Sequence, residues 1–136
     1  MREILFRGKQ IKDGKWIEGY YCPKPYSHFP CEPTIFPFET INKDWHGERV
    51  DPETVCQFTG LHDKNGRKIF EGDIVKWTGS LYKVVFERRY GTAYFGIKIS
   101  DFETWYFCNS CAANLMEIAG NIYDNPELLK GGNENG

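Results

Sequence analysis

The sequence predicts a mainly β protein whose short strands form a meander that closes into a small barrel. Two observations lead to this prediction. Runs rich in β-branched and aromatic residues recur at short, regular spacing, and glycines preceded by Asp or Asn stand between them as hairpin turns. Hydrophobic residues make up 40% of the 136 residues and aromatic residues 16%. This is enough apolar mass for one main core.

The first hairpin is predicted at the N-terminus. The dipeptide Asp13-Gly14 separates two β-type runs, residues 6–11 and residues 15–21. In the second run, alternate side chains point to opposite faces, as a half-buried strand requires.

A proline-rich stretch follows the hairpin. Five prolines fall within residues 22–38, which excludes a long helix or a central strand and predicts a loop or an extended arm. Its aromatic residues indicate that it packs on the barrel or on a partner. We therefore expect residues 1–60 to hold the N-terminal hairpin and a proline-rich arm packed on the barrel.

The barrel itself is expected in residues 61–130. A second hairpin is predicted at Asn65-Gly66, where a type I′ turn would need positive φ at both residues. The β-type runs 73–77, 81–86, 93–99 and 104–107 follow.

The chain ends with three smaller features. The propensities of residues 112–118 leave open a turn of helix or a closing strand. Asn125 followed by Pro126 has the form of a helix start and predicts a short C-terminal helix. Residues 131–136 are expected to be a disordered tail.

Charge and hydropathy narrow the class of protein. The formal net charge is −2, which excludes a uniformly basic protein held to nucleic acid by bulk charge. No apolar run approaches the 18 or more residues that a membrane span needs, and the charged N-terminus is unlike a signal peptide. We expect a cytoplasmic protein without membrane contact.

The five cysteines are an odd number in a chain of this class, which favours reduced thiols over a disulfide framework. Cys108 and Cys111 have the spacing of a metal-binding or redox pair. A metal would need two more ligands, and the remaining pair, Cys22 and Cys31, is too widely spaced. We predict structural thiols and no metal.

No catalytic constellation is recognisable. His28, His46 and His62 lie in loop-like segments without a nearby nucleophile motif, and there is no phosphate-binding glycine loop, Gly-x-Ser-x-Gly elbow or His-Glu-x-x-His. We therefore predict a protein that is not an enzyme and that has no cofactor.

The basic residues concentrate in one segment. Residues 61–98 contain 8 basic and 4 acidic side chains, whereas residues 99–136 contain 1 and 6. The basic residues of 61–98, Lys98 among them, interleave with aromatic residues, as in small barrels that grip phosphates and stack bases. Solvated strand faces explain the same pattern. The candidate nucleic-acid contacts are Arg67, Lys68, Lys76, Trp77, Lys83, Arg88 and Arg89.

Three stretches resemble a known family: residues 1–9 leading into 14–20, residues 50–61 with 63–66 and 69–75, and residues 120–129. Together they resemble the YopX-like proteins carried by bacteriophages and prophages. The resemblance implies a mainly β protein with an SH3-like barrel that works in the cytosol of the bacterial host. It implies no activity and supplies no catalytic or binding residues.

Three hypotheses for the function remain, and the third, an enzyme, would be favoured by a ligand found in a polar pocket. The first is a phage-derived, non-enzymatic accessory protein that acts through protein contacts, with homo-oligomerisation as its simplest form. The second is a small barrel that binds nucleic acid through residues 61–98.

Overall fold

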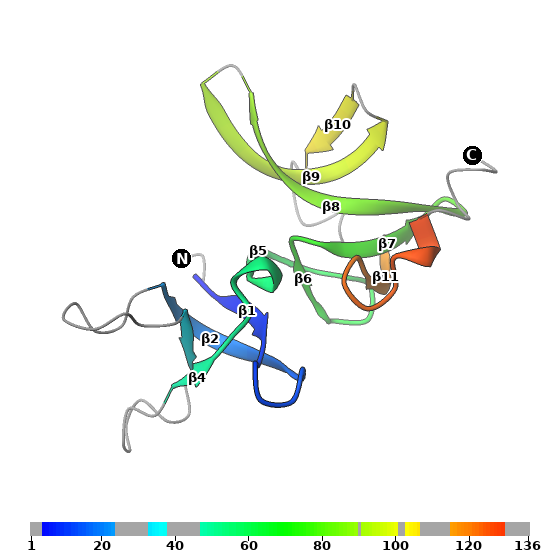
Figure 1. Ribbon diagram of the computed structural model, residues 1–136. Coiled ribbons are helices and arrows are strands. Elements are labelled where there is room, and N and C mark those ends of the chain that lie inside the picture. The colour runs from blue at the N-terminus through cyan, green and yellow to red at the C-terminus, as the bar shows by residue number, and fades with distance from the viewer. Residues whose placement is uncertain are drawn as a thin grey trace. The chain divides into compact units, whose positions relative to one another are not determined.

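The computed structural model describes residues 4–23, 33–37, 47–89, 91–100, 103–106 and 115–129 (Figure 1). For residues 88–89, 92, 99–100 and 103–106 it describes the backbone alone. The prediction of a mainly β protein is confirmed, because the described part forms antiparallel sheets and one short helix.

The chain divides into two compact units, Met1–Phe58 and Thr59–Gly136, called here the N-terminal and C-terminal units. Strand β5 (Cys56–His62) passes from one into the other. Its first residues pair with β1 (Phe6–Lys9), in the register Arg7↔Cys56.

The predicted N-terminal hairpin is confirmed. Strand β1 pairs with β2 (Trp16–Cys22) in the register Lys9↔Trp16. Gly14 takes the positive φ of +73° that the turn requires. The Asp13 carboxylate accepts a hydrogen bond from the Lys15 N–H at 3.0 Å, so the turn is stabilised by its own side chain.

The proline-rich stretch contributes a strand, so the prediction that it holds no central strand is wrong. Strand β3 (Thr34–Phe36) lies between β2 and β4 (Glu48–Arg49) in the sheet. Pro33 and Pro37 flank β3, and the three residues between them keep the N–H groups that strand pairing needs. The rest of the stretch, residues 24–32 and 38, is outside the described residues.

The sheet of the N-terminal unit closes on its first strand. Directly after β4, Val50 forms a bridge with Gln10. The Ile11 N–H donates to the Arg49 carbonyl and the Asp51 N–H donates to the Lys9 carbonyl, both at 2.9 Å. The backbone therefore forms a narrow ring β1-β2-β3-β4-β1, which leaves no free edge at this point.

The narrow interior of this ring explains Gly8 and Gly19. A Cβ on Gly8 would lie 3.2 Å from Val50 Cβ and 3.3 Å from Ile35 Cδ1, two side chains that are fully buried. A Cβ on Gly19 would collide with the carbonyl oxygen of Phe36. Both positions need glycine for close packing.

A single turn of 3₁₀ helix, η2 (Pro52–Thr54), follows Val50 and packs on β1. Asp51 caps it by accepting the Glu53 N–H at 3.1 Å. The Thr54 hydroxyl donates to the Asp51 carbonyl at 2.7 Å and accepts from the Lys9 N–H at 2.9 Å. The Asp-Pro-Glu-Thr sequence is thus a capped turn fastened to the first strand.

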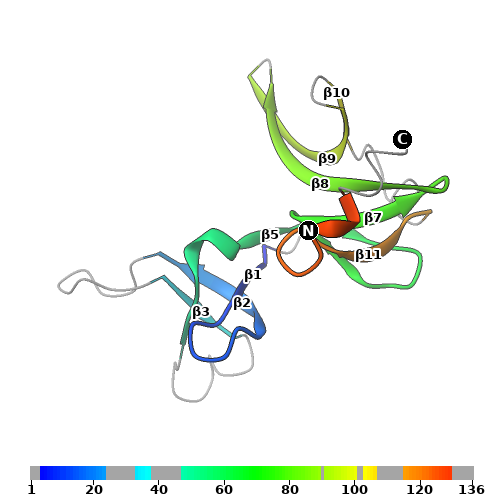
Figure 2. The same cartoon turned by 45° about the vertical axis from the view of Figure 1, so that its right-hand side comes forward.

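The C-terminal unit contains a five-stranded antiparallel sheet in the order β10-β9-β8-β7-β11 (Figures 1 and 2). Its strands are β7 (Asp73–Trp77), β8 (Ser80–Arg89), β9 (Thr92–Ser100), β10 (Glu103–Tyr106) and β11 (Glu117–Asn121). Strand β6 (Lys68–Phe70) lies next to β5. The buried core cluster of this unit is Ile69, Val75, Val84, Ile97 and Met116.

The described chain ends with a turn that is stabilised by asparagine side chains, followed by the predicted short helix. Asn121 Oδ1 accepts the N–H groups of Tyr123 and Asp124, and Asn125 Oδ1 accepts the Asn121 N–H. The helix covers residues 127–129, which confirms that prediction. Of residues 112–118, Glu117 and Ile118 form part of a closing strand, and residues 112–114 are outside the described part.

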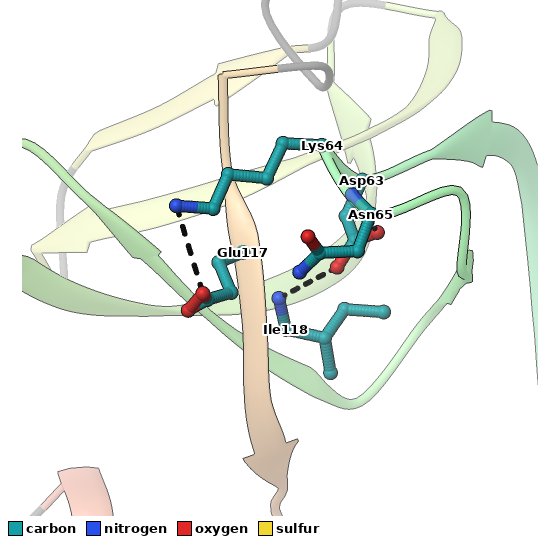
Figure 3. A network of polar contacts seen from close by, with 5 residues as sticks. All are labelled: Asp63, Lys64, Asn65, Glu117 and Ile118. Carbon is teal, nitrogen blue, oxygen red and sulfur yellow. Dashed lines mark hydrogen bonds and ion pairs between the residues drawn. The ribbon is translucent and has the colours of Figure 1, made fainter.

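A buried carboxylate, Asp63, joins the β5–β6 turn to strand β11 (Figure 3). Its Oδ1 accepts the N–H groups of Asn65 and Arg67, both at 2.9 Å, and its Oδ2 accepts the Ile118 N–H at 3.0 Å. The Lys64 N–H adds a bond of 2.9 Å to the carbonyl of Met116. One side chain therefore organises its own turn and fixes a strand 55 residues away.

The turn at Asn65-Gly66 is a hairpin turn, but not of type I′. Among the described residues, only Gly66 of this pair has positive φ, at +82°. The Gly66 N–H donates to the Asp63 carbonyl at 3.0 Å and the Asp63 N–H donates to the Arg67 carbonyl at 2.8 Å. These bonds are typical of a longer hairpin loop that ends in a left-handed glycine.

The pKa of Asp63 is set by two opposing effects. Burial alone would raise it, but the three backbone N–H donors, helped by the charge of Arg67, lower the pKa below its ordinary value. The folded state therefore favours the ionised carboxylate. This part of the stability is complete above the unfolded-state pKa of about 3.9 and is lost as the pH falls through the lower folded-state pKa.

We predict that Asp63→Ala destabilises the protein by about 3 kcal/mol at neutral pH, because three backbone N–H groups, all partly buried, lose a charged acceptor. Asp63→Asn, which keeps the shape and one acceptor oxygen, is expected to cost about 2 kcal/mol. Urea denaturation measures both. The difference between the wild type and Asp63→Asn should shrink as the pH is lowered below about 4. A pH-independent difference would contradict the assigned role of the ionised carboxylate.

The β7–β8 turn holds the one described non-glycine residue with positive φ. Trp77 pairs with Ser80, and the two residues between them, Thr78 and Gly79, have φ of +52° and +86°. Positive φ at both central positions is the geometry of a type I′ turn. A β-branched residue is strained there, by roughly 1–2 kcal/mol, whereas Asn tolerates it.

We predict that Thr78→Asn raises the free energy of unfolding by about 1 kcal/mol, because Asn-Gly is the preferred type I′ pair. The measurement is the urea midpoint at unchanged m-value. Gly79→Ala, the matched change at the second position, should lower the midpoint, because alanine disfavours the φ of +86°. A lower midpoint for Thr78→Asn would show that the turn is not strained at residue 78.

Candidate nucleic-acid interface

The β7-β8-β9 sheet has two chemically different faces. The register pairs Val75 with Tyr82 and Val84 with Ile97. These residues belong to the buried core cluster or pack against it. Because side chains alternate along a strand, the residues between them point to the opposite face.

Three lysines share that opposite face. Lys83 on β8 lies directly opposite Lys98 on β9. On its other side Lys83 is paired with Ile74 of β7, and Lys76 lies two residues farther along β7 on the same face. We call Lys76, Lys83 and Lys98 the lysine face. Lys76 is exposed, and the other two are half-buried.

The Lys83–Lys98 pair is unfavourable for the fold. Side chains directly opposite on antiparallel strands have their Cβ atoms about 5 Å apart, and like charges at that separation destabilise the sheet. The cost is modest, up to about 1 kcal/mol, but either position could hold a carboxylate or a neutral residue. The pair concentrates positive charge on this face, beside the fully buried Ile74.

The register places two acidic residues on this same face, Glu87 and Glu117, and Glu117 forms an ion pair with a lysine of another segment. Glu117 on β11 lies opposite Lys76. Its carboxylate forms an ion pair with Lys64 from the β5–β6 turn, with 3.6 Å between Nζ and Oε2 (Figure 3). Glu117 therefore pairs with Lys64 and is a cross-strand neighbour of Lys76.

The structure brings together only part of the predicted nucleic-acid site. Lys76 and Lys83 share the lysine face. Trp77 lies on the core face, where it packs against the core cluster with its ring centroid 6.2 Å from that of Tyr82. Adjacent strand residues point to opposite faces, so the period of two already separates Trp77 from Lys76.

The other predicted contacts lie elsewhere or outside the described side chains. Arg67 is exposed in the β5–β6 turn and Lys68 is half-buried at the start of β6. The backbone of Arg88 and Arg89 belongs to β8, and their side chains are not among those described. Lys98, absent from the predicted contacts, joins the site through the β8–β9 register.

A second group of cations and aromatics lies in the N-terminal unit. The Arg7 guanidinium carbon is 4.6 Å and the Lys9 ammonium 5.5 Å from the centre of the Trp16 ring. These contacts follow from the β1–β2 register, in which Lys9 lies opposite Trp16. The alternation of charged and aromatic residues in both strands was the signal that could have identified them.

Tyr21 is a titratable residue of the N-terminal unit whose pKa is shifted. Burial, together with the neighbouring Cys22, raises the pKa of the Tyr21 hydroxyl. This makes Tyr21 a weaker acid and a poorer candidate for proton transfer at neutral pH. The Tyr21 ring packs at 5.7 Å from that of Phe6, which is a structural role.

The described part of the chain contains no group of side chains that would form a metal site. Within residues 4–23, 33–37, 47–89, 91–100, 103–106 and 115–129, no three His, Cys, Asp or Glu side chains are grouped as a metal site would require. Cys56 is buried and its Sγ lies 3.2 Å from the Thr54 carbonyl. Cys31, Cys108, Cys111, His28 and His46 are outside these residues, so the prediction of no metal stays a prediction.

Among the described helical residues, no helix has the length and apolar character needed to cross a membrane.

Comparison with known proteins places the chain in a family. No curated protein sequence matches it. Among solved structures, it is similar to protein EF1440 from Enterococcus faecalis, with a TM-score of 0.54 and 24% sequence identity, over 95% of this chain and 99% of that one. That likeness shows a shared fold. The family model described as YopX protein matches residues 5–130, and the chain therefore belongs to the YopX family.

Proposed function

We propose that this protein binds nucleic acid through the lysine face of its C-terminal unit. The observation that carries the proposal is the pair of lysines placed directly opposite each other on β8 and β9, with Lys76 as a diagonal neighbour of Lys83. Three cations on adjacent strands form a local positive field on a chain whose net charge is −2. A polyanion would bind where this field is strongest.

Because the arrangement of the lysines destabilises the sheet, it supports the explanation that they bind a ligand over the explanation that they only keep the face soluble. A face that only has to stay hydrated can alternate lysine with glutamate, as the register Lys76↔Glu117 does. The Lys83↔Lys98 pair instead places like charges together. A bound phosphate between them would turn this repulsion into attraction.

A second candidate is a phage-derived, non-enzymatic accessory protein that acts through protein contacts in the bacterial cytosol. The observation that favours it is the aromatic and aliphatic surface of the N-terminal unit. Tyr20 is 52% exposed in the middle of a strand and lies opposite Phe36, and Ile4 and Ile11 are also exposed. Exposed tyrosines are enriched in protein interfaces, and a second copy of the chain is the simplest partner.

We predict salt-dependent binding of a labelled duplex, measured by fluorescence anisotropy between about 50 and 200 mM salt. Lys83→Gln and Lys98→Gln should each reduce the slope of log K against log[salt] by about 0.9. Lys98→Glu should abolish measurable binding while raising the free energy of unfolding by up to about 1 kcal/mol, because it converts a like-charge pair into an opposite-charge pair. Loss of binding would then not be due to unfolding.

The matched control is Lys15→Gln, an exposed lysine in the β1–β2 turn of the N-terminal unit. It carries the same change in net charge and should leave the slope unchanged. Equal effects of Lys15→Gln and Lys83→Gln would reject the lysine face and indicate attraction by overall charge. No binding to duplex or single strands at low salt would reject the proposal.

For the second candidate, we predict self-association at micromolar concentration in sedimentation velocity, above the 15.8 kDa of one chain. Tyr20→Lys should weaken it at least about tenfold, as expected for a tyrosine at the centre of an interface. The control is Leu115→Lys, an exposed hydrophobic residue of the C-terminal unit. A monomer at all concentrations would exclude the homo-oligomer.

A further inference from the structure

We infer that Asn65 is a site of spontaneous deamidation and that Asp63 slows the reaction as long as the β5–β6 turn is formed. The modification converts the side-chain amide of Asn65 into a carboxylate or into an isoaspartyl linkage. The inference does not depend on the proposed nucleic-acid function. It follows from the sequence of the turn, its exposure and the hydrogen bonds that hold it.

The reaction needs only water as a further reactant. The backbone nitrogen of Gly66 gives up its proton to water and forms a bond to the Cγ carbon of Asn65. The bond between Cγ and Nδ2 breaks, and Nδ2 leaves as ammonia with a proton from water. A second water molecule then opens the resulting succinimide ring at either of its carbonyl groups, which gives aspartate or isoaspartate.

The residue that follows an asparagine decides how readily it reacts. A following glycine hinders the attacking nitrogen least, because it has no Cβ. Among the described asparagines, only Asn65 precedes a glycine. Asn121 precedes Ile122, whose β-branched side chain hinders the approach. Asn125 precedes Pro126, which has no N–H to give up.

The turn leaves both reacting residues open to water. Asn65 and Gly66 are exposed. A Cβ placed on Gly66 would meet no heavy atom within 4 Å outside its two chain neighbours. Access of water therefore does not limit the reaction, and a restraint has to come from the backbone.

The hydrogen bonds of Asp63 supply this restraint (Figure 3). The Gly66 N–H donates to the Asp63 carbonyl at 3.0 Å. The succinimide has no hydrogen on this nitrogen, so the bond has to break before the ring closes. The N–H groups of Asn65 and Arg67 both donate to the Asp63 carboxylate at 2.9 Å, which fixes the peptide units before and after the reacting one.

The size of the protection follows from the bonds that opening the turn gives up. A hydrogen bond to a charged acceptor changes the opening equilibrium by roughly tenfold or more. Deamidation then proceeds from the small open population of the turn. The isoaspartyl product has one more backbone atom between residues 65 and 66, so the turn cannot close again with the same hydrogen bonds.

The experiment follows deamidation of the full chain at mildly alkaline pH, in buffer and in unfolding urea, by peptide mapping with mass spectrometry. Asn135-Gly136 is the same dipeptide in the stretch that the sequence predicts to be a disordered tail, and it serves as the internal reference for the effect of urea. We expect the rate at Asn65, relative to Asn135, to be at least about tenfold lower in buffer than in urea.

Two variants separate the effect of Asp63 from that of overall stability. Asp63→Asn removes the charged acceptor and should raise the rate at Asn65 in buffer by about tenfold. Gly79→Ala, which disfavours the separate β7–β8 turn, keeps the Asp63 bonds and should leave the rate unchanged. The two variants are compared at the same free energy of unfolding, which small additions of urea adjust.

Three outcomes would overturn the inference. Equal relative rates at Asn65 in buffer and in urea would show that the turn gives no protection. Equal acceleration by Gly79→Ala and Asp63→Asn would show that the protection comes from folding as a whole and not from Asp63. No deamidation at Asn65 in urea would show that this residue is not a modification site.

Discussion

The Asp63 carboxylate is the interaction on which the C-terminal unit depends. It accepts backbone hydrogen bonds from its own turn and from Ile118 of β11, so it fixes the closing strand to the second hairpin. Strand β11 pairs with β7, β7 pairs with β8, and β8 pairs with β9. The core cluster and the lysine face lie on opposite faces of the sheet that these strands form. This ionised side chain therefore supports the stability of the unit by holding the second hairpin and β11 together.

Local sequence signals predicted the local structure well. The Asp13-Gly14 hairpin and the short C-terminal helix were recognisable because each depends on a few adjacent residues with special backbone preferences. Strand β3 was missed because the prolines were taken to exclude a central strand from the whole stretch 22–38. The three residues between Pro33 and Pro37 can still pair with neighbouring strands. The type of the Asn65-Gly66 turn was wrong because the Asp63 side chain supplies bonds that a dipeptide rule does not consider.

The candidate site was predicted less well from the sequence than the local structure was. The excess of basic residues in 61–98 was visible in the sequence, but its arrangement depends on pairing between strands that composition does not reveal. Lys98 lies fifteen residues from Lys83 in the chain and becomes its neighbour only through the β8–β9 register. Trp77 was a different error, because alternation along a strand was enough to separate it from Lys76. Long-range register and the period of two together decide which charges meet.

The stretches that resemble the YopX family make turns and close packing in the described structure. Asp51 caps a turn fastened to β1, Asp63 organises the second hairpin, and Asn121 and Asn125 build the loop before the C-terminal helix. Gly120 belongs to the same set, because a Cβ there would lie 2.5 Å from Asn125 Oδ1. Residues that build turns specify how the chain folds, whereas a ligand surface needs side chains that folding does not require. Lys83 and Lys98 lie outside the stretches that carry the resemblance, and their like-charge pairing is unfavourable for the sheet. The family model extends over residues 5–130 and so covers these strand faces too, and membership of the family does not by itself locate a ligand surface.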